Sequence, residues 1–271
     1  MSEASDLGRR RSRWRRRRAR RETQATMTML EHLTELRRRL VVSLAAFFVI
    51  SAVAFAFYEE LLAFIREPFC GLPEELQGPQ GCQLVFVRVL GGFLFRLKLT
   101  ALAGVMFAAP VWLYQIWAFV TPGLTAREKK YAIPFVLSSV TFFVIGAAVA
   151  YWTLPTGIRI LVTIGGGGLV PLLGAEEYLN FVGVMFLGFG LLFEIPLVLF
   201  FLGLAGVITV DTLRRQRKAA VVGLVALAAV VTPSQDPYTL LVLSVPLYAL
   251  YELTIWLLHL VERRRARNQS V

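Results

Sequence analysis

The sequence predicts an all-α, polytopic membrane protein with six transmembrane helices and both termini in the cytoplasm. Apolar residues make up 56% of its 271 residues, and the mean hydropathy is +0.63. Soluble domains are about 45–50% apolar. The apolar residues form long blocks without charges, as membrane-spanning helices require, and Lys and Arg are concentrated between the blocks.

The first membrane-associated element is expected to begin near residue 28. Thr28 and Glu31 have the spacing of a capping box, and apolar residues then recur at helical spacing as far as Leu40. We therefore expect a short helix on the membrane surface, followed by a first span over about residues 40–58.

Five further spans are expected. They cover about residues 99–120, 133–154, 183–204, 219–231 and 238–258. The fifth apolar block is short, because its 13 residues rise only about 20 Å in a hydrocarbon core of about 30 Å. A short span favours local thinning of the bilayer, which we expect beside this helix.

The distribution of positive charge predicts the orientation. Of the 29 Lys and Arg residues, 24 lie in residues 1–39, 121–132, 206–218 and 259–271. Cytoplasmic segments of membrane proteins are enriched in Lys and Arg, so these four segments are expected inside the cell.

Three regions are predicted along the chain. Residues 1–27 form an arginine-rich cytoplasmic extension, which we expect to be disordered and held loosely on anionic lipids. Residues 28–260 form the six-helix domain, and residues 261–271 form a basic cytoplasmic tail.

Several function classes are disfavoured. The net charge of +11 is not accompanied by a nucleic-acid-binding motif, so no nucleic-acid partner is expected. The glycine run at residues 165–168 lacks the Gly-Lys-Ser/Thr of a phosphate-binding loop, and the two cysteines form no metal-type cluster. The sequence therefore predicts no catalytic site, no metal and no cofactor.

Cys70 and Cys82 both lie in the first outward loop. That loop faces an oxidising compartment in most bacteria, where it can hold either a disulfide or two free thiols. A disulfide across the 11 intervening residues is a candidate, and it would contribute up to about 3 kcal/mol to stability.

Two carboxylates are expected at the cytoplasmic face, Glu35 on the surface helix and Glu128 in the turn after the second span. The residues alone favour structural roles. Glu35 can pair with Arg38 or Arg39 along the helix. Glu128 follows Thr125 by three residues, which predicts a capping box for the third span.

Two segments carry a resemblance to a known family. They are His32-Leu-x-Glu-Leu-Arg-x-Arg-Leu40 and Ala109-Pro-x-x-x-Tyr-Gln-x-Trp-x-Phe-x-x-Pro-x-Leu124, the latter followed by Glu128 and two basic residues. They resemble the signature motifs of TatC, the signal-peptide receptor of the twin-arginine protein translocase. The resemblance covers about residues 28 to 260.

The resemblance implies a binding surface for the paired arginines of a signal peptide. Two adjacent guanidinium groups need two carboxylate acceptors, a role that Glu35 and Glu128 would fill. Arg37 matches an arginine of the family's first motif, and its implied role at this site is to order the surface helix against lipid phosphate or Glu128. The same binding surface of the family is matched at Phe119, Pro122 and Leu124. For the last three, helix termination and anchoring at the membrane interface are equal alternatives.

Glu194 lies near the middle of the fourth span, where a charged side chain costs about 2.5–3.5 kcal/mol. Gly188 and Gly190 beside it permit close helix packing. The resemblance implies that Glu194 faces an intramembrane groove and meets single-span TatA- and TatB-type subunits. The alternative is a hydrogen bond between helices of this chain.

The segment Thr232-Pro-Ser-Gln-Asp-Pro237 resembles the family's Thr-Pro-Pro-Asp motif, with the aspartate displaced to Asp236. Asp236 is assigned to the same partner surface as Glu194. Glu252, in the sixth span, is expected to pair with a basic group.

The resulting hypothesis is a receptor and scaffold without a catalytic reaction, which exports folded proteins across the bacterial cytoplasmic membrane and self-associates in a multi-copy complex. The main alternative is a proton-coupled small-molecule transporter that uses Glu194. It is disfavoured because the sequence shows no inverted repeat and no second deep carboxylate. A lipid-modifying enzyme lacks a cluster of His, Asp and Ser, since only His32 and His259 are available.

Overall fold

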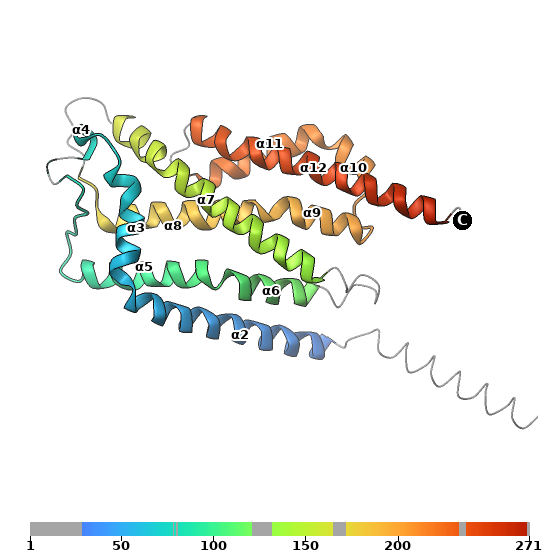
Figure 1. Ribbon diagram of the computed structural model, residues 1–271, viewed down its shortest axis with the longest axis horizontal. Coiled ribbons are helices and arrows are strands. Elements are labelled where there is room, and N and C mark those ends of the chain that lie inside the picture. Colours follow the sequence, from blue (N-terminus) through green and yellow to red (C-terminus); the bar gives the residue numbers. More distant parts are fainter. Residues whose placement is uncertain are drawn as a thin grey trace, which may run out of the picture. The chain divides into compact units, whose positions relative to one another are not determined.

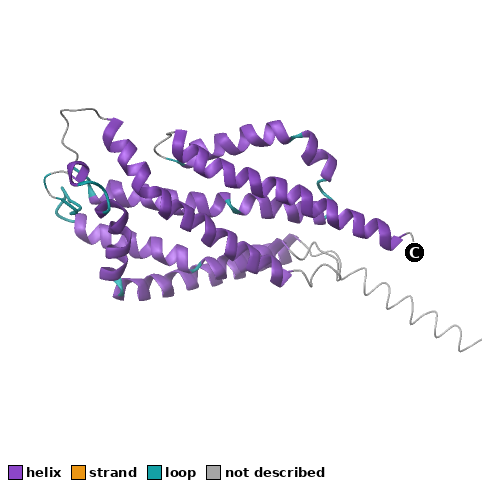
Figure 2. Ribbon diagram, turned by 45° about the horizontal axis from the view of Figure 1, so that its top comes forward, coloured by secondary structure: helices purple, strands orange, loops and turns teal. Residues whose placement is uncertain are grey.

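The computed structural model describes residues 29–77, 79, 81–120, 132–164, 172–232 and 237–269. Nearly all of this described chain is helical (Figure 2), and it contains no strand, only an isolated bridge between Val85 and Gly174. The all-α prediction is confirmed. The chain divides into two compact units, Met1–Val42 and Ser43–Val271.

The first described helix is α2 (Met29–Ala56). The expectation of a separate surface helix before the first span is wrong, because both form one uninterrupted helix. No Gly or Pro stands between Met29 and Ala56 to break it. Its segment Leu30–Ala56 is long and apolar enough to cross a membrane.

Two shorter helices follow, α3 (Tyr58–Cys70) and α4 (Glu74–Gln77). The corner between α2 and α3 is fixed by Arg96, whose Nη2 donates to the carbonyl oxygen of Phe55 at 3.2 Å. Its guanidinium carbon also lies 4.2 Å and 4.6 Å from the ring centres of Phe55 and Tyr58, an arrangement typical of cation–π attraction.

The second predicted span is a bent pair, α5 (Gly91–Phe107) and α6 (Ala109–Val120). The two helices meet at an angle of 51°. Pro110 explains the break, because it has no N–H to donate to the carbonyl of Met106 one turn earlier.

Helix α7 (Ala132–Ile164) packs along α8 (Ala175–Leu192), and α9 (Glu194–Leu204) packs against α12 (Pro237–Gln269) (Figure 1). A Cβ added to Gly190 would lie 2.6 Å from the ring of Phe143, and one added to Gly188 would lie 2.1 Å from Val231. The expected close packing at these two glycines is confirmed.

The remaining helices are α10 (Val210–Arg215) and α11 (Arg217–Val231). The end of α11 is level with Gly188 of α8, near the middle of the longer span Ala175–Leu204, because Val231 lies against Gly188. Since α8 begins at Ala175, it continues for about 20 Å beyond that point. The structure therefore has a short helix where the fifth span is predicted.

Among the described residues, four helices are long and apolar enough to cross a membrane, and the bent pair α5 and α6 makes a fifth candidate. Helix α11, with 15 residues, corresponds to the fifth predicted span and completes the six. The buried core joins α3, α5, α7, α8 and α12 through fully buried side chains, among them Phe69, Leu99, Leu154, Met185 and Leu247.

Candidate functional site

Glu194 is the first residue of α9, directly after the break between α8 and α9 at Phe193. The residue is only 8% exposed. Its Oε2 accepts a hydrogen bond from Ser139 Oγ of α7 at 2.6 Å, and Ser139 Oγ accepts one from Trp117 Nε1 of α6 at 3.0 Å. Three helices thus meet through one chain of buried polar groups.

The direction of these hydrogen bonds follows from the chemistry of the groups. An indole N–H can only donate, so Trp117 donates to Ser139, and the hydroxyl hydrogen of Ser139 is free to be donated to Glu194. The second carboxyl oxygen, Oε1, is buried and has no hydrogen-bond partner among the described residues. An unpaired buried oxygen costs about 1–3 kcal/mol, so a further hydrogen-bond donor at Oε1 would be favourable.

Aromatic and aliphatic side chains surround this polar chain. The ring of Trp117 lies 5.2 Å from that of Phe135 and 5.1 Å from that of Phe201, and Leu197 belongs to the same cluster. Because the surroundings are apolar, a polar group placed beside Oε1 would be recognised strongly.

An apolar cavity of about 410 Å³ lies between α3, α5, α7 and α8. It extends from Phe64 and Tyr151 to Phe143, which stands one helical turn from Ser139. Its lining is almost entirely apolar, so it suits an apolar ligand such as part of a lipid chain.

The first unit holds Glu35, whose Oε1 accepts from Arg39 Nε at 3.1 Å and also from Arg39 Nη2. Its Oε2 has no hydrogen-bond partner in the described parts of the chain. Arg37 is exposed. Phe119 is half-buried at the end of α6.

Four predicted site residues lie outside the described residues: Pro122, Leu124, Glu128 and Asp236. The structure therefore does not test the distance between Glu35 and Glu128. Cys70 and Cys82 are paired as a disulfide with their Cα atoms 4.9 Å apart, within the usual range of about 4.4–6.8 Å.

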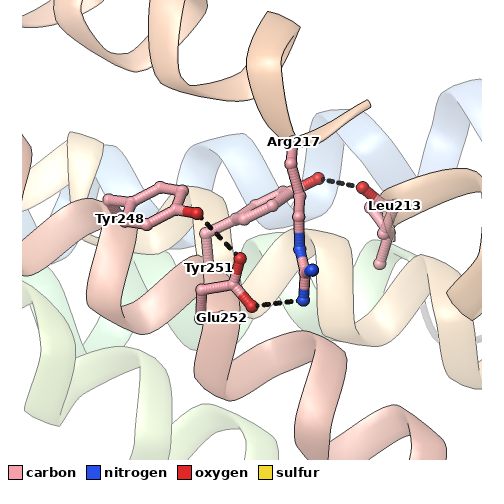
Figure 3. Close-up of polar contacts among 5 residues, drawn as sticks. All are labelled: Leu213, Arg217, Tyr248, Tyr251 and Glu252. Carbon is pink, nitrogen blue, oxygen red and sulfur yellow. Dashed lines mark hydrogen bonds and ion pairs between the residues drawn. The ribbon is translucent and has the colours of Figure 1, made fainter. Parts of the chain in front are cut away.

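A second polar cluster joins α12 to the start of α11 and the end of α10 (Figure 3). Glu252 accepts from Arg217 Nη2 at 2.8 Å and from the hydroxyl of Tyr248 at 2.9 Å, and the hydroxyl of Tyr251 donates to the carbonyl oxygen of Leu213 at 2.8 Å. The expected pairing of Glu252 with a basic group is confirmed.

Sequence reasoning did not find the partners of Glu194. The sequence marks Trp117 only as a position of the Ala109–Leu124 segment, and it does not mark Ser139. The sequence signal available for such a partner was a hydroxyl residue within a neighbouring apolar span. No group of three His, Cys, Asp or Glu side chains that could hold a metal occurs in the ranges that the structure covers.

These features define a polytopic helical membrane protein with a buried carboxyl group between its spans. Residues 31–246 match the family described as Sec-independent protein translocase protein (TatC), and the chain belongs to this family. It is therefore a component of the Sec-independent protein translocase, a membrane complex with other Tat subunits.

Relatives and solved structures agree with this assignment. The TatC protein of Frankia casuarinae is 41% identical over 258 residues, covering 93% of this chain and 71% of the relative. That of Aquifex aeolicus is 34% identical over 247 residues, covering 90% and 100%. A crystal structure of the twin-arginine translocase receptor TatC in DDM matches with a TM-score of 0.70 and 34% identity, covering 84% of this chain and 99% of that one.

Proposed function

We propose that this chain is the receptor and scaffold of the twin-arginine translocase in a bacterial cytoplasmic membrane, with both termini in the cytoplasm and no catalytic reaction of its own. The observation that carries the proposal is the family match over residues 31–246, which includes Glu35, Glu128 and Glu194. The partners are TatA- and TatB-type single-span subunits, further copies of this chain and anionic lipids at its basic ends.

Glu35 and Glu128 bind the two arginines of the signal peptide. Each guanidinium presents a planar fork of donors that fits a carboxylate. Arg39 occupies one oxygen of Glu35, while Oε2 is without a partner in the described chain and can accept a guanidinium of the peptide. Other side chains contribute to the same surface: Arg37, Phe119, Pro122 and Leu124.

Glu194 and Asp236 contact the single-span subunits within the membrane. The support for Glu194 is the unpaired Oε1 in an apolar surrounding. A proton-coupled small-molecule transporter needs a carboxyl group that titrates, whereas a docking site needs only a hydrogen-bonding group. Glu194→Gln keeps a donor and an acceptor, so we expect it to keep export activity.

The receptor proposal is tested by peptide binding to the purified protein. A peptide with two adjacent arginines is expected to bind, and the same peptide with both arginines changed to lysine is expected to bind at least tenfold more weakly, because lysine lacks the planar fork. Equal affinity for the two peptides would refute the proposal.

A further inference from the structure

The carboxyl group of Glu194 is held by neighbouring helices rather than by its own. Its only hydrogen bond among the described residues is the one from Ser139 of α7. Ser139 is in turn held by Trp117 of α6, and all three residues are less than 9% exposed. The chain of donors therefore decides which of the two oxygens is engaged.

We propose that Ser139 and Trp117 are positioning residues for Glu194, which engage Oε2 and leave Oε1, buried in this chain alone, to bond with a polar side chain of a membrane helix whose docking uncovers it. The inference rests on the proposed docking role of Glu194. The inference adds two points to that role. Ser139 and Trp117 orient the carboxyl group, and the partner helix contributes an uncharged hydrogen-bonding side chain. An uncharged group is required because a charge at this depth is costly.

Glu194 stands near a local gap in the backbone hydrogen bonds of its own span. Pro196 provides no N–H, so the bond to the carbonyl oxygen of Leu192 is missing, although α8 and α9 otherwise run on as one span, Ala175–Leu204. The carboxyl group is held by side-chain hydrogen bonds from neighbouring helices, directly by Ser139 of α7 and, through Ser139, by Trp117 of α6.

The chain offers a matched set of variants. Ser139→Ala removes the donor to Glu194, and Ser139→Thr restores a hydroxyl at the same position. Trp117→Phe removes the indole N–H but keeps a ring against Phe135 and Phe201. Ser138→Ala is the control, because the Ser138 hydroxyl bonds only to the carbonyl oxygen of Pro134 in its own helix, at 2.9 Å.

Two measurements are made on the complete translocase in membranes. The first is the photocrosslinking yield to a single-span subunit from a photoreactive residue at Leu191, which is 51% exposed and lies one turn before Glu194. Loss of one hydrogen bond predicts a roughly two- to tenfold lower yield for Ser139→Ala and Trp117→Phe. Ser139→Thr and Ser138→Ala are expected to match the wild type.

The second measurement is the infrared signal of the Glu194 carboxyl group, isolated as the difference between the wild type and Glu194→Gln. A merely structural role of Ser139 would not couple this signal to partner contact. We expect the change of the carboxyl band between samples with and without the single-span subunits to be lost in Ser139→Ala and to return in Ser139→Thr.

The outcomes separate this inference from the function on which it rests. If Glu194→Ala does not reduce the crosslinks, the docking role of Glu194 itself is wrong. If Glu194→Ala abolishes them while Ser139→Ala and Trp117→Phe behave like Ser138→Ala in both measurements, docking stands and the positioning inference is overturned.

Discussion

Gly146 of α7 lies so close to Phe189 of α8 that a Cβ on the glycine would be 2.6 Å from the carbonyl oxygen of Phe189. The obstacle is backbone, which cannot rotate away as a side chain can. Gly146→Ala should therefore destabilise the protein by about 1–3 kcal/mol, the usual cost of overpacking. Thermal unfolding of the purified protein in detergent measures this cost.

The control for this prediction is Gly223→Ala in α11, where an added Cβ meets nothing within 4 Å. Alanine in an open helical position is expected to be neutral or to stabilise by up to about 1 kcal/mol. Equal unfolding temperatures for the two variants would show that α7 and α8 are not in close contact at Gly146.

Tyr251 is 4% exposed and links α12 to the end of α10 through Leu213 (Figure 3). Tyr251→Phe removes only the hydroxyl, so we expect a loss of about 1 kcal/mol of stability, typical of one buried hydrogen bond. Tyr114→Phe, at a residue 51% exposed, should change little. The same unfolding measurement compares them, and identical stabilities would contradict the assigned hydrogen bond.

The disulfide between Cys70 and Cys82 closes the loop that contains α4. The side-chain amide of Gln77 donates to the carbonyl oxygens of Cys70 and Leu72 at 3.0 Å and 2.6 Å, which orders the same loop. Replacing both cysteines with serine should lower stability by up to about 3 kcal/mol. Mass spectrometry of peptides from the unreduced protein checks the bond, and two free thiols would disprove it.

The early end of α11 predicts where the bilayer is thin. Val231 is level with Gly188, and its neighbour Val230 is 81% exposed. In intact cells, a cysteine at Val230 should react with a membrane-impermeant thiol reagent added outside. A cysteine at Ile145, which is 43% exposed near the middle of α7, should stay protected. Protection of both positions would exclude thinning at α11.

Features of single helices could be predicted from sequence because their causes are local. The charge-free blocks marked the spans, and the short fifth block predicted the length of α11. The separate surface helix was a wrong expectation because a polar face was given more weight than the absence of Gly and Pro between Met29 and Ala56. Pro110 is a local signal for the bend at Ala108, because a proline removes one backbone hydrogen bond of a helix.

The partners of Glu194 could not be predicted, because they depend on the rotation of separate helices about their axes. Ser138 and Ser139 are adjacent in sequence and chemically identical, yet they point in directions about 100° apart on α7. Only Ser139 reaches Glu194, which lies 55 residues away. The cost of a carboxyl group in the membrane identified Glu194 itself, but tertiary packing determines which hydroxyl bonds to it.

The proposed recognition of paired arginines by Glu35 and Glu128 is tested most directly by a cycle of peptide affinities. Glu35→Gln and Glu128→Gln are measured singly and together against peptides with two arginines or two lysines. Each single change should weaken binding of the arginine peptide by about tenfold or more, since hydrogen bonds between charged groups contribute about 1.5–3 kcal/mol. Arg39→Ala, which frees the engaged oxygen of Glu35, should preserve binding.

The double variant should no longer distinguish arginine from lysine. A double variant that still prefers the arginine peptide by the wild-type factor would contradict the account, because the two carboxylates would then not be the groups that bind the guanidinium pair.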